Sequence, residues 1–116
     1  MEHIGEEQGR RISQVVHSAG SGNESEVLRV WHAYLQEHVV FPFAAVVRED
    51  SSGPIRPGEH VTVEGMVSLD EPYGTIVSVK HRLDIYKLPL RDLEAVVASD
   101  ETVQAVGDYE VWMGRG

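Results

Sequence analysis

The stretch HVVFPFAAVV, residues 38–47, divides this chain into a helix-forming part and a strand-forming part. Ahead of it, apolar and aromatic side chains and one histidine recur at the spacing of a single helix face: Val27, Trp31, Tyr34, Leu35 and His38. Asn23 can cap this helix, with Glu26 at the third helical position. Pro42 lacks an amide hydrogen and disfavours helical geometry at Phe41, so the helix is predicted to end at residues 38–39.

Short segments after Pro42 alternate apolar with polar residues, as strands with one buried face do: FAAVVRE, HVTVEGMV, GTIVSVKH, RLDIYKLPL and RDLEAVVAS. Gly65 interrupts the second segment and predicts a bulge or bend. The connectors DSSGPIRPG and LDEPYG are rich in turn-forming residues. Because too few helices intervene for a parallel sheet, we predict an α+β fold. In it, one N-terminal amphipathic helix packs on a small, strongly bent antiparallel sheet or SH3-like barrel of about five strands.

The two ends of the chain fall outside that pattern. Helical spacing near the start is shared by three apolar residues: Ile12, Val15 and Val16. The Ser/Gly-rich SAGSGNES that follows is typical of a flexible connector. Residues 1–22 are therefore predicted to be a flexible or partly helical appendage, and residues 23–116 a single globular domain. Near the other end, Tyr109 and Trp112 have the spacing of a last helical turn that packs on the core.

The composition limits the partners. The chain carries 19 acidic and 10 basic residues, a formal net charge of −9. This charge disfavours nucleic acid and anionic membranes, because both attract basic surfaces. No apolar stretch reaches the roughly 20 residues of a membrane span, and no signal-peptide pattern occurs at the start. The absence of cysteine excludes disulfides, zinc-thiolate sites and cysteine nucleophiles, and a cytoplasmic location is expected.

Known motifs of catalysis and nucleotide binding are absent from the sequence. It contains no P-loop, no dinucleotide-binding glycine pattern and no G-x-S-x-G elbow, so we do not expect an enzyme. The six histidines lack zinc-ligand spacing. Carboxylates in turns suit Ca²⁺, a hard cation that takes about 6–8 oxygen ligands. The EF-hand pattern fails everywhere, so a calcium site here has to be assembled from several loops.

Several segments in the same order resemble the bacterial calcium-binding family typified by the cyanobacterial protein CcbP: WHAYLQEHVVFPFAAVV, GPIRPGEHVTV, LDEPYGTIVSV, LPLRDLEAV and DYEVWM. Together they extend over about residues 28–113. The resemblance implies an α+β fold, calcium binding without EF-hands, and a buffering or regulatory role in the cytoplasm. It also implies metal ligands in the acidic turns of the pattern: Glu49, Asp50, Glu59, Asp70 and Glu71.

One position departs from the family pattern. Where the family has F-P-F-E-A, this chain has Ala44 after Phe43. Calcium sites depend on the number of carboxylates, so the missing carboxylate predicts weaker binding or none. The alternative function is therefore a metal-independent, small-barrel module that binds a protein partner and has kept the family fold. A calcium titration distinguishes the two.

Overall fold

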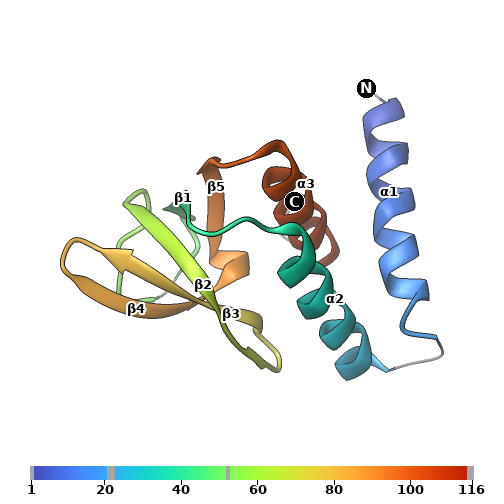
Figure 1. The fold of residues 1–116 in the computed structure, drawn as a ribbon, viewed down its shortest axis with the longest axis horizontal. Coiled ribbons are helices and arrows are strands. Elements are labelled where there is room, and N and C mark those ends of the chain that lie inside the picture. The colour runs from blue at the N-terminus through green and yellow to red at the C-terminus, as the bar shows by residue number, and fades with distance from the viewer. Residues whose placement is uncertain (1, 21–22, 52, 115–116) are drawn as a thin grey trace.

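The computed structural model describes residues 2–20, 23–51 and 53–114, with side chains from residue 6 onward. The elements in chain order are α1 (Glu2–His17), α2 (Glu24–His38), β1 (Phe43–Val47), β2 (His60–Asp70), β3 (Gly74–His81), β4 (Asp84–Pro89), the 3-10 helix η1 (Leu90–Asp92), β5 (Leu93–Val97) and α3 (Asp100–Trp112). Figure 1 shows the strands gathered at one end of the molecule and the helices at the other. The predicted α+β class is confirmed.

Helix α2 begins and ends where the sequence predicts. The Asn23 side chain accepts a hydrogen bond from the backbone N–H of Glu26 at 3.1 Å, which caps the first turn. The helix ends at His38, and the chain passes through a cis Pro42 into β1. Phe43, the first residue of that strand, is 4% exposed. The Phe-Pro-Phe step therefore turns the chain from the helix into the core of the sheet.

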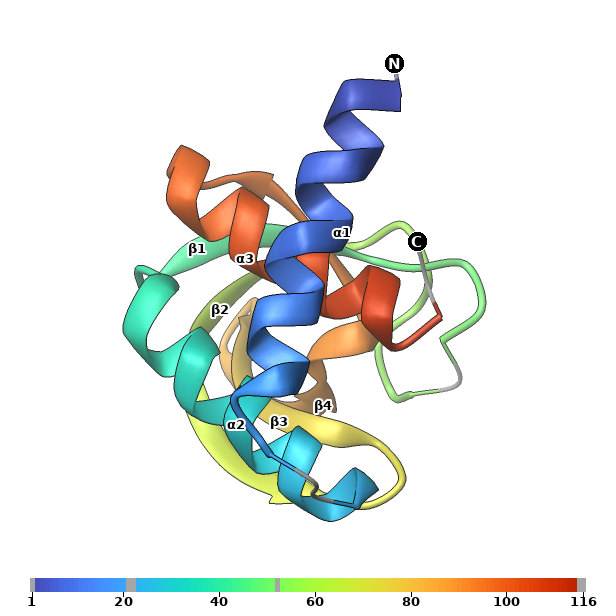
Figure 2. The ribbon, with the colours of Figure 1, turned by 90° about the vertical axis from the view of Figure 1, so that its right-hand side faces the viewer.

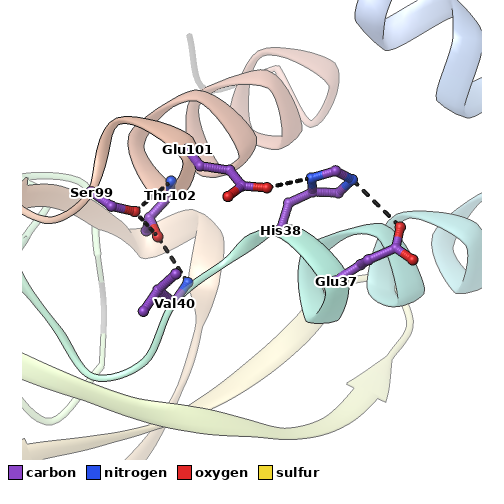
Figure 3. Close-up of polar contacts among 6 residues, drawn as sticks. All are labelled: Glu37, His38, Val40, Ser99, Glu101 and Thr102. Atoms are coloured by element: carbon purple, nitrogen blue, oxygen red, sulfur yellow. Dashed lines mark hydrogen bonds and ion pairs between the residues drawn. The ribbon is translucent and has the colours of Figure 1, made fainter.

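Contacts with the start of α3 hold the exit from α2, as Figure 3 shows. The Val40 amide donates to Thr102 Oγ1 at 2.8 Å, and His38 Nδ1 lies 2.9 Å from Glu101 Oε2. Ser99 caps α3 by accepting from the Thr102 amide at 3.1 Å, and its hydroxyl also donates to Thr102 Oγ1. These bonds hold the connection from α2 to β1 against the connection from β5 to α3.

The strands form one antiparallel sheet in the order β4-β3-β2-β1-β5. Closing a barrel requires the two edge strands to pair, and within the described ranges β4 and β5 do not. The bent sheet is therefore the correct form of the prediction, and the SH3-like barrel is wrong. Register shifts in β2 fall between Val63 and Gly65 and between Met66 and Ser68. These shifts bend the strand, and the first confirms the irregularity predicted at Gly65.

Helices α2 and α3 pack against the sheet through an aromatic cluster. Trp31 is fully buried, with its ring centroid 5.7 Å from those of both Tyr109 and Trp112. The Tyr109 hydroxyl accepts a hydrogen bond from the Thr75 amide at 3.0 Å. At Gly74 the backbone has φ of +80°, and a Cβ there would overlap that hydroxyl. Glycine is therefore required where the β2–β3 turn meets α3.

Helix α3 is longer than the sequence predicts. The prediction covers only a last turn at Tyr109 and Trp112, whereas the helix has 13 residues. Its helical start depends on the Ser99 cap and on the acidic residues of the first turn, which favour the helix dipole. Gly107 and several β-branched residues weaken the local helical signal. Burial of residues such as Val106, which is 2% exposed, compensates for that weakness.

Helix α1 lies along α2 and α3, as Figure 2 shows. Val15 is 6% exposed. Arg11 Nε donates to Asp108 Oδ2 at 2.7 Å, and Gln8 Nε2 donates to Asp108 Oδ1 at 3.0 Å. The division into an appendage of residues 1–22 and a separate domain stays a prediction, and residues 1, 21 and 22 lie outside the described ranges. None of the described helices is long and apolar enough to cross a membrane.

Candidate functional site

Three chain segments meet at the end of β1. The Val47 amide donates to the carbonyl of Glu59 at 3.0 Å, and the Gly58 amide donates to the carbonyl of Val47 at 2.8 Å. The Arg48 amide donates to the carbonyl of Asp92, also at 2.8 Å. Gly58 has φ of +87°, a conformation that glycine adopts without strain. These bonds bring together the acidic turn after β1, the residue before β2 and the start of β5.

A surface cavity of about 400 Å³ lies at this meeting point. Its lining residues are Val46, Val47, Arg48, Glu49, Asp50, Gly58 and Glu94. Two of the predicted calcium ligands, Glu49 and Asp50, are among them. Glu94 is a third carboxylate, and it pairs opposite Val46 in the β1–β5 ladder. The ligand prediction omits Glu94 because only this non-local pairing, which the sequence does not reveal, brings it to the cavity. We call these residues the β1 loop site.

Arg48 supplies positive charge beside these carboxylates. Its guanidinium donates to Glu110 of α3, a side chain that is 4% exposed. Burial opposes the charge on Arg48, but the hydrogen bond and charge of Glu110, followed by the charges of Glu94 and Asp50, raise its pKa. Glu110 balances the charge of Arg48. The three carboxylates that line the cavity therefore leave the β1 loop site with an excess of negative charge.

Glu59 lies beside the same loop but contacts a different side chain. Its Oε1 is 3.0 Å from Nε2 of His81, at the end of β3. The hydrogen bond from His81 lowers the pKa of Glu59 below its ordinary value. Glu59 is thus ionised at neutral pH, as a calcium ligand has to be. A cation there would share this carboxylate with the imidazole.

The other two predicted ligands lie at the far end of β2. That strand has 11 residues, so Asp70 is on the order of 30 Å from Glu59 along the chain path. Glu71 accepts a hydrogen bond from Ser25 of α2. Together with Glu24, it lines a second cavity of about 220 Å³. One ion therefore cannot use all five predicted ligands, which the fold separates into two groups.

The donor chemistry of the β1 loop site fits a hard cation, because its side-chain donors are carboxylate oxygens. Among residues 6–20, 23–51 and 53–114, no three histidine, aspartate or glutamate side chains lie close enough together to hold a metal ion. Calcium also accepts backbone carbonyl oxygens and water. An ion at the β1 loop site would therefore be held by few side chains together with backbone carbonyls and water. The five predicted ligands stay predictions.

Comparison with known proteins determines the family. The family model of CcbP, described as calcium binding, matches residues 10–113. The chain belongs to the CcbP family. This confirms the resemblance found in the five sequence segments. The match begins within α1 and continues just past the end of α3. No curated protein sequence matches the chain.

Two solved structures have the same fold. The crystal structure of Anabaena CcbP gives a TM-score of 0.76 at 28% sequence identity, over 96% of this chain and 92% of that one. A calcium-binding protein in its calcium-binding form gives a TM-score of 0.73 at 29% identity, with the same coverage. The CcbP fold therefore includes nearly the whole of this chain.

Ala44 lies near the β1 loop site. Burial alternates along β1, so Ala44 shares the outer face of the strand with Val46, which lines the cavity. Thr62 and Val97 are its neighbours on the adjacent strands. A glutamate at position 44, which the resemblance implies for the family, would be about 7 Å from the cavity along the strand. At that distance its charge contributes to the field that a cation experiences.

Proposed function

We propose that this chain is a non-enzymatic protein of the cytoplasm that binds Ca²⁺ at the β1 loop site. The observation that carries the proposal is that Glu49, Asp50 and Glu94 line one cavity in a member of a calcium-binding family. The solved relative in its calcium-binding form supports Ca²⁺ as the ion. Glu59 is the next carboxylate along the same loop connection and would contribute when the ion draws it from His81.

Asp70 and Glu71 are proposed as a second, weaker place for a cation. Glu24 lines the same small cavity as Glu71 and adds a carboxylate from the start of α2. The hydrogen bond from Ser25 to Glu71 has to compete with any ion there. The same cavity is also lined by Arg91, whose positive charge opposes cation binding. We therefore expect the β1 loop site to fill first.

Isothermal titration calorimetry with calcium, and separately with magnesium, tests the proposal at moderate ionic strength. Asp50→Asn and Glu94→Gln should each weaken calcium binding at the β1 loop site, whereas Asp70→Asn should affect only the weaker step. Glu6→Gln, on the exposed part of α1, removes the same charge far from both cavities and serves as the matched control. No calcium heat, together with no rise in melting temperature at millimolar calcium, would refute the proposal.

A buffer and a regulator differ in how far the response to calcium extends. Arg48 connects the β1 loop site to Glu110 inside α3, so a regulatory response has a physical route to the helices. Amide NMR shifts confined to the loops around β1 on calcium addition would identify a buffer. Shifts that reach α3 would identify a regulator, and loss of those distant shifts in Arg48→Met would assign the route to this contact.

A metal-independent protein-interaction module remains the competing proposal. Ala44 in place of the family glutamate favours it, because the site has one carboxylate fewer to attract a cation. If this second proposal is correct, chelator and calcium should leave both the melting temperature and the set of bound proteins unchanged. A pull-down in chelator and in calcium, run beside the calorimetry, distinguishes the two functions.

A further inference from the structure

The β3–β4 hairpin is at the end of the molecule farthest from the helices (Figure 1). Its two strands turn at Arg82 and Leu83, where Arg82 has φ of 59°. Leu83 is 94% exposed, the highest value among the large hydrophobic side chains of the described residues, and Ile85 is 59% exposed. Neither side chain contributes to the core or to the β1 loop site. Their exposure therefore calls for a separate explanation.

Strand β4 is an edge of the sheet with a regular backbone. It pairs with β3 from Asp84 to Pro89 without a register shift, and among the described residues no strand pairs with its other side. The opposite edge strand, β5, is irregular, because its pairing shifts between Ala44 and Ala45 of β1. Such bulges obstruct the addition of another strand. Pro89 at the end of β4 has no amide hydrogen, so β4 presents a regular row of edge donors and acceptors from Asp84 to Leu88.

The hairpin is basic although the chain has a net charge of −9. The sequence contains only two lysines, Lys80 and Lys87, and both lie in this hairpin with Arg82. All three side chains are exposed. Asp84 is the only acidic residue in positions 80–87. We call the exposed cations and hydrophobic residues of this hairpin the basic edge: Lys80, Arg82, Leu83, Ile85 and Lys87.

The basic edge presents apolar and charged side chains on one face. Along β4, Ile85 and Lys87 lie on the exposed face, whereas Leu88 lies on the other face and is 2% exposed. Lys80 of β3 is directly opposite Ile85, and opposite residues in an antiparallel pair share a face. A strand added beside β4 would therefore meet an apolar position flanked by two lysines.

We propose that the basic edge docks an extended, acidic segment of a partner protein, which adds to the sheet as a strand beside β4. Main-chain hydrogen bonds to β4 supply affinity, as in other cases of strand addition. Apolar side chains of the segment cover Leu83 and Ile85, and its carboxylates pair with the cations, which supplies selectivity. Self-pairing of two β4 edges about a two-fold axis is disfavoured, because it places the same cations of both copies together.

The test titrates fluorescent peptides into the full chain, in chelator, so that the result does not depend on calcium. One peptide alternates valine and glutamate over roughly seven residues, a usual strand length. A second has lysine in place of glutamate, and a third has proline at the centre, which removes a strand donor. The glutamate peptide should bind at least about tenfold more tightly than either of the others, and more weakly as salt increases. Amide NMR shifts should fall on β4 and its turn.

Single substitutions locate the contact. Ile85→Glu and Lys87→Glu should each weaken binding of the glutamate peptide about tenfold or more. Val97→Glu, at a valine that is 72% exposed on the other edge strand, is the matched control and should change nothing. All three positions are exposed, and equal melting temperatures confirm folding. Equal binding of the acidic and basic peptides, shifts on β5, or unchanged affinity in Lys87→Glu would overturn the proposal. So would a dimer that Ile85→Glu dissociates, or binding to anionic vesicles in place of the peptide.

Discussion

Introducing a carboxylate at position 44 tests the calcium proposal, because the structure gives the distance from which the change in calcium affinity can be worked out. Ala44 and Val46 are two residues apart on one face of β1, which places a new carboxylate about 7 Å from the cavity. A single negative charge at that distance from Ca²⁺ contributes about 1 kcal/mol in water. Screening at physiological salt reduces this to about 0.5 kcal/mol. The field alone should therefore tighten calcium binding about twofold, whereas direct ligation should tighten it tenfold or more.

Calorimetry on Ala44→Glu measures this difference, and Ser13→Glu is its matched control. Ser13 is exposed on α1, so the control adds the same charge to the chain far from the β1 loop site. Melting temperatures without calcium establish whether β1 accepts the longer side chain. If the calcium affinity does not change, or rises equally in both variants, a charge at position 44 does not act on calcium at the β1 loop site and the reasoning is refuted.

Three further changes test contacts that stabilise the fold or hold a predicted ligand. Arg11→Met leaves a buried α3 carboxylate without its cation and should lower the free energy of unfolding in urea by roughly 2–3 kcal/mol; the cost is below that of a fully buried pair because Arg11 is 28% exposed. Tyr109→Phe removes the acceptor of the buried Thr75 amide and should cost about 1–2 kcal/mol in the same measurement. His81→Gln should raise the pKa of Glu59 toward its ordinary value in an NMR titration, because it removes the hydrogen bond from the imidazole. Because a lowered pKa adds stability that is lost as the pH falls through it, this variant should also show a smaller loss of stability in acid.

Elements with strong local signals are predictable from this sequence. Helix α2 has both a cap at Asn23 and a stop at Pro42, so its bounds follow from neighbouring residues alone. Helix α3 does not, because Gly107 lowers its intrinsic helical preference and its stability comes from burial against the sheet. Barrel closure is equally non-local: alternation predicts the strands, but only the pairing order determines whether the edges meet.

The candidate site is readable only in part for the same reason. Glu49 and Asp50 are visible in the sequence as an acidic turn after a strand. Glu94 reaches them through the register of β1 with β5, and no spacing in the sequence predicts that register. Asp70 and Glu71 look equivalent to the other acidic turns in the sequence. In the fold, the length of β2 separates them from the β1 loop site, so similar acidic turns lie in different places.

Arginine placement determines which carboxylates remain for a cation. Asp108 and Glu110 are buried and are bound by Arg11 and Arg48, so both stabilise the fold and neither is a suitable ligand. Arg48 also acts on the surface, because it lies close enough for Asp50 and other carboxylates of the site to raise its pKa. Its positive charge opposes an incoming Ca²⁺, while its bond to Glu110 draws that charge inward. The number of acidic residues alone therefore does not predict calcium affinity. At the proposed site, calcium affinity would also depend on how strongly Glu110 retains this one guanidinium.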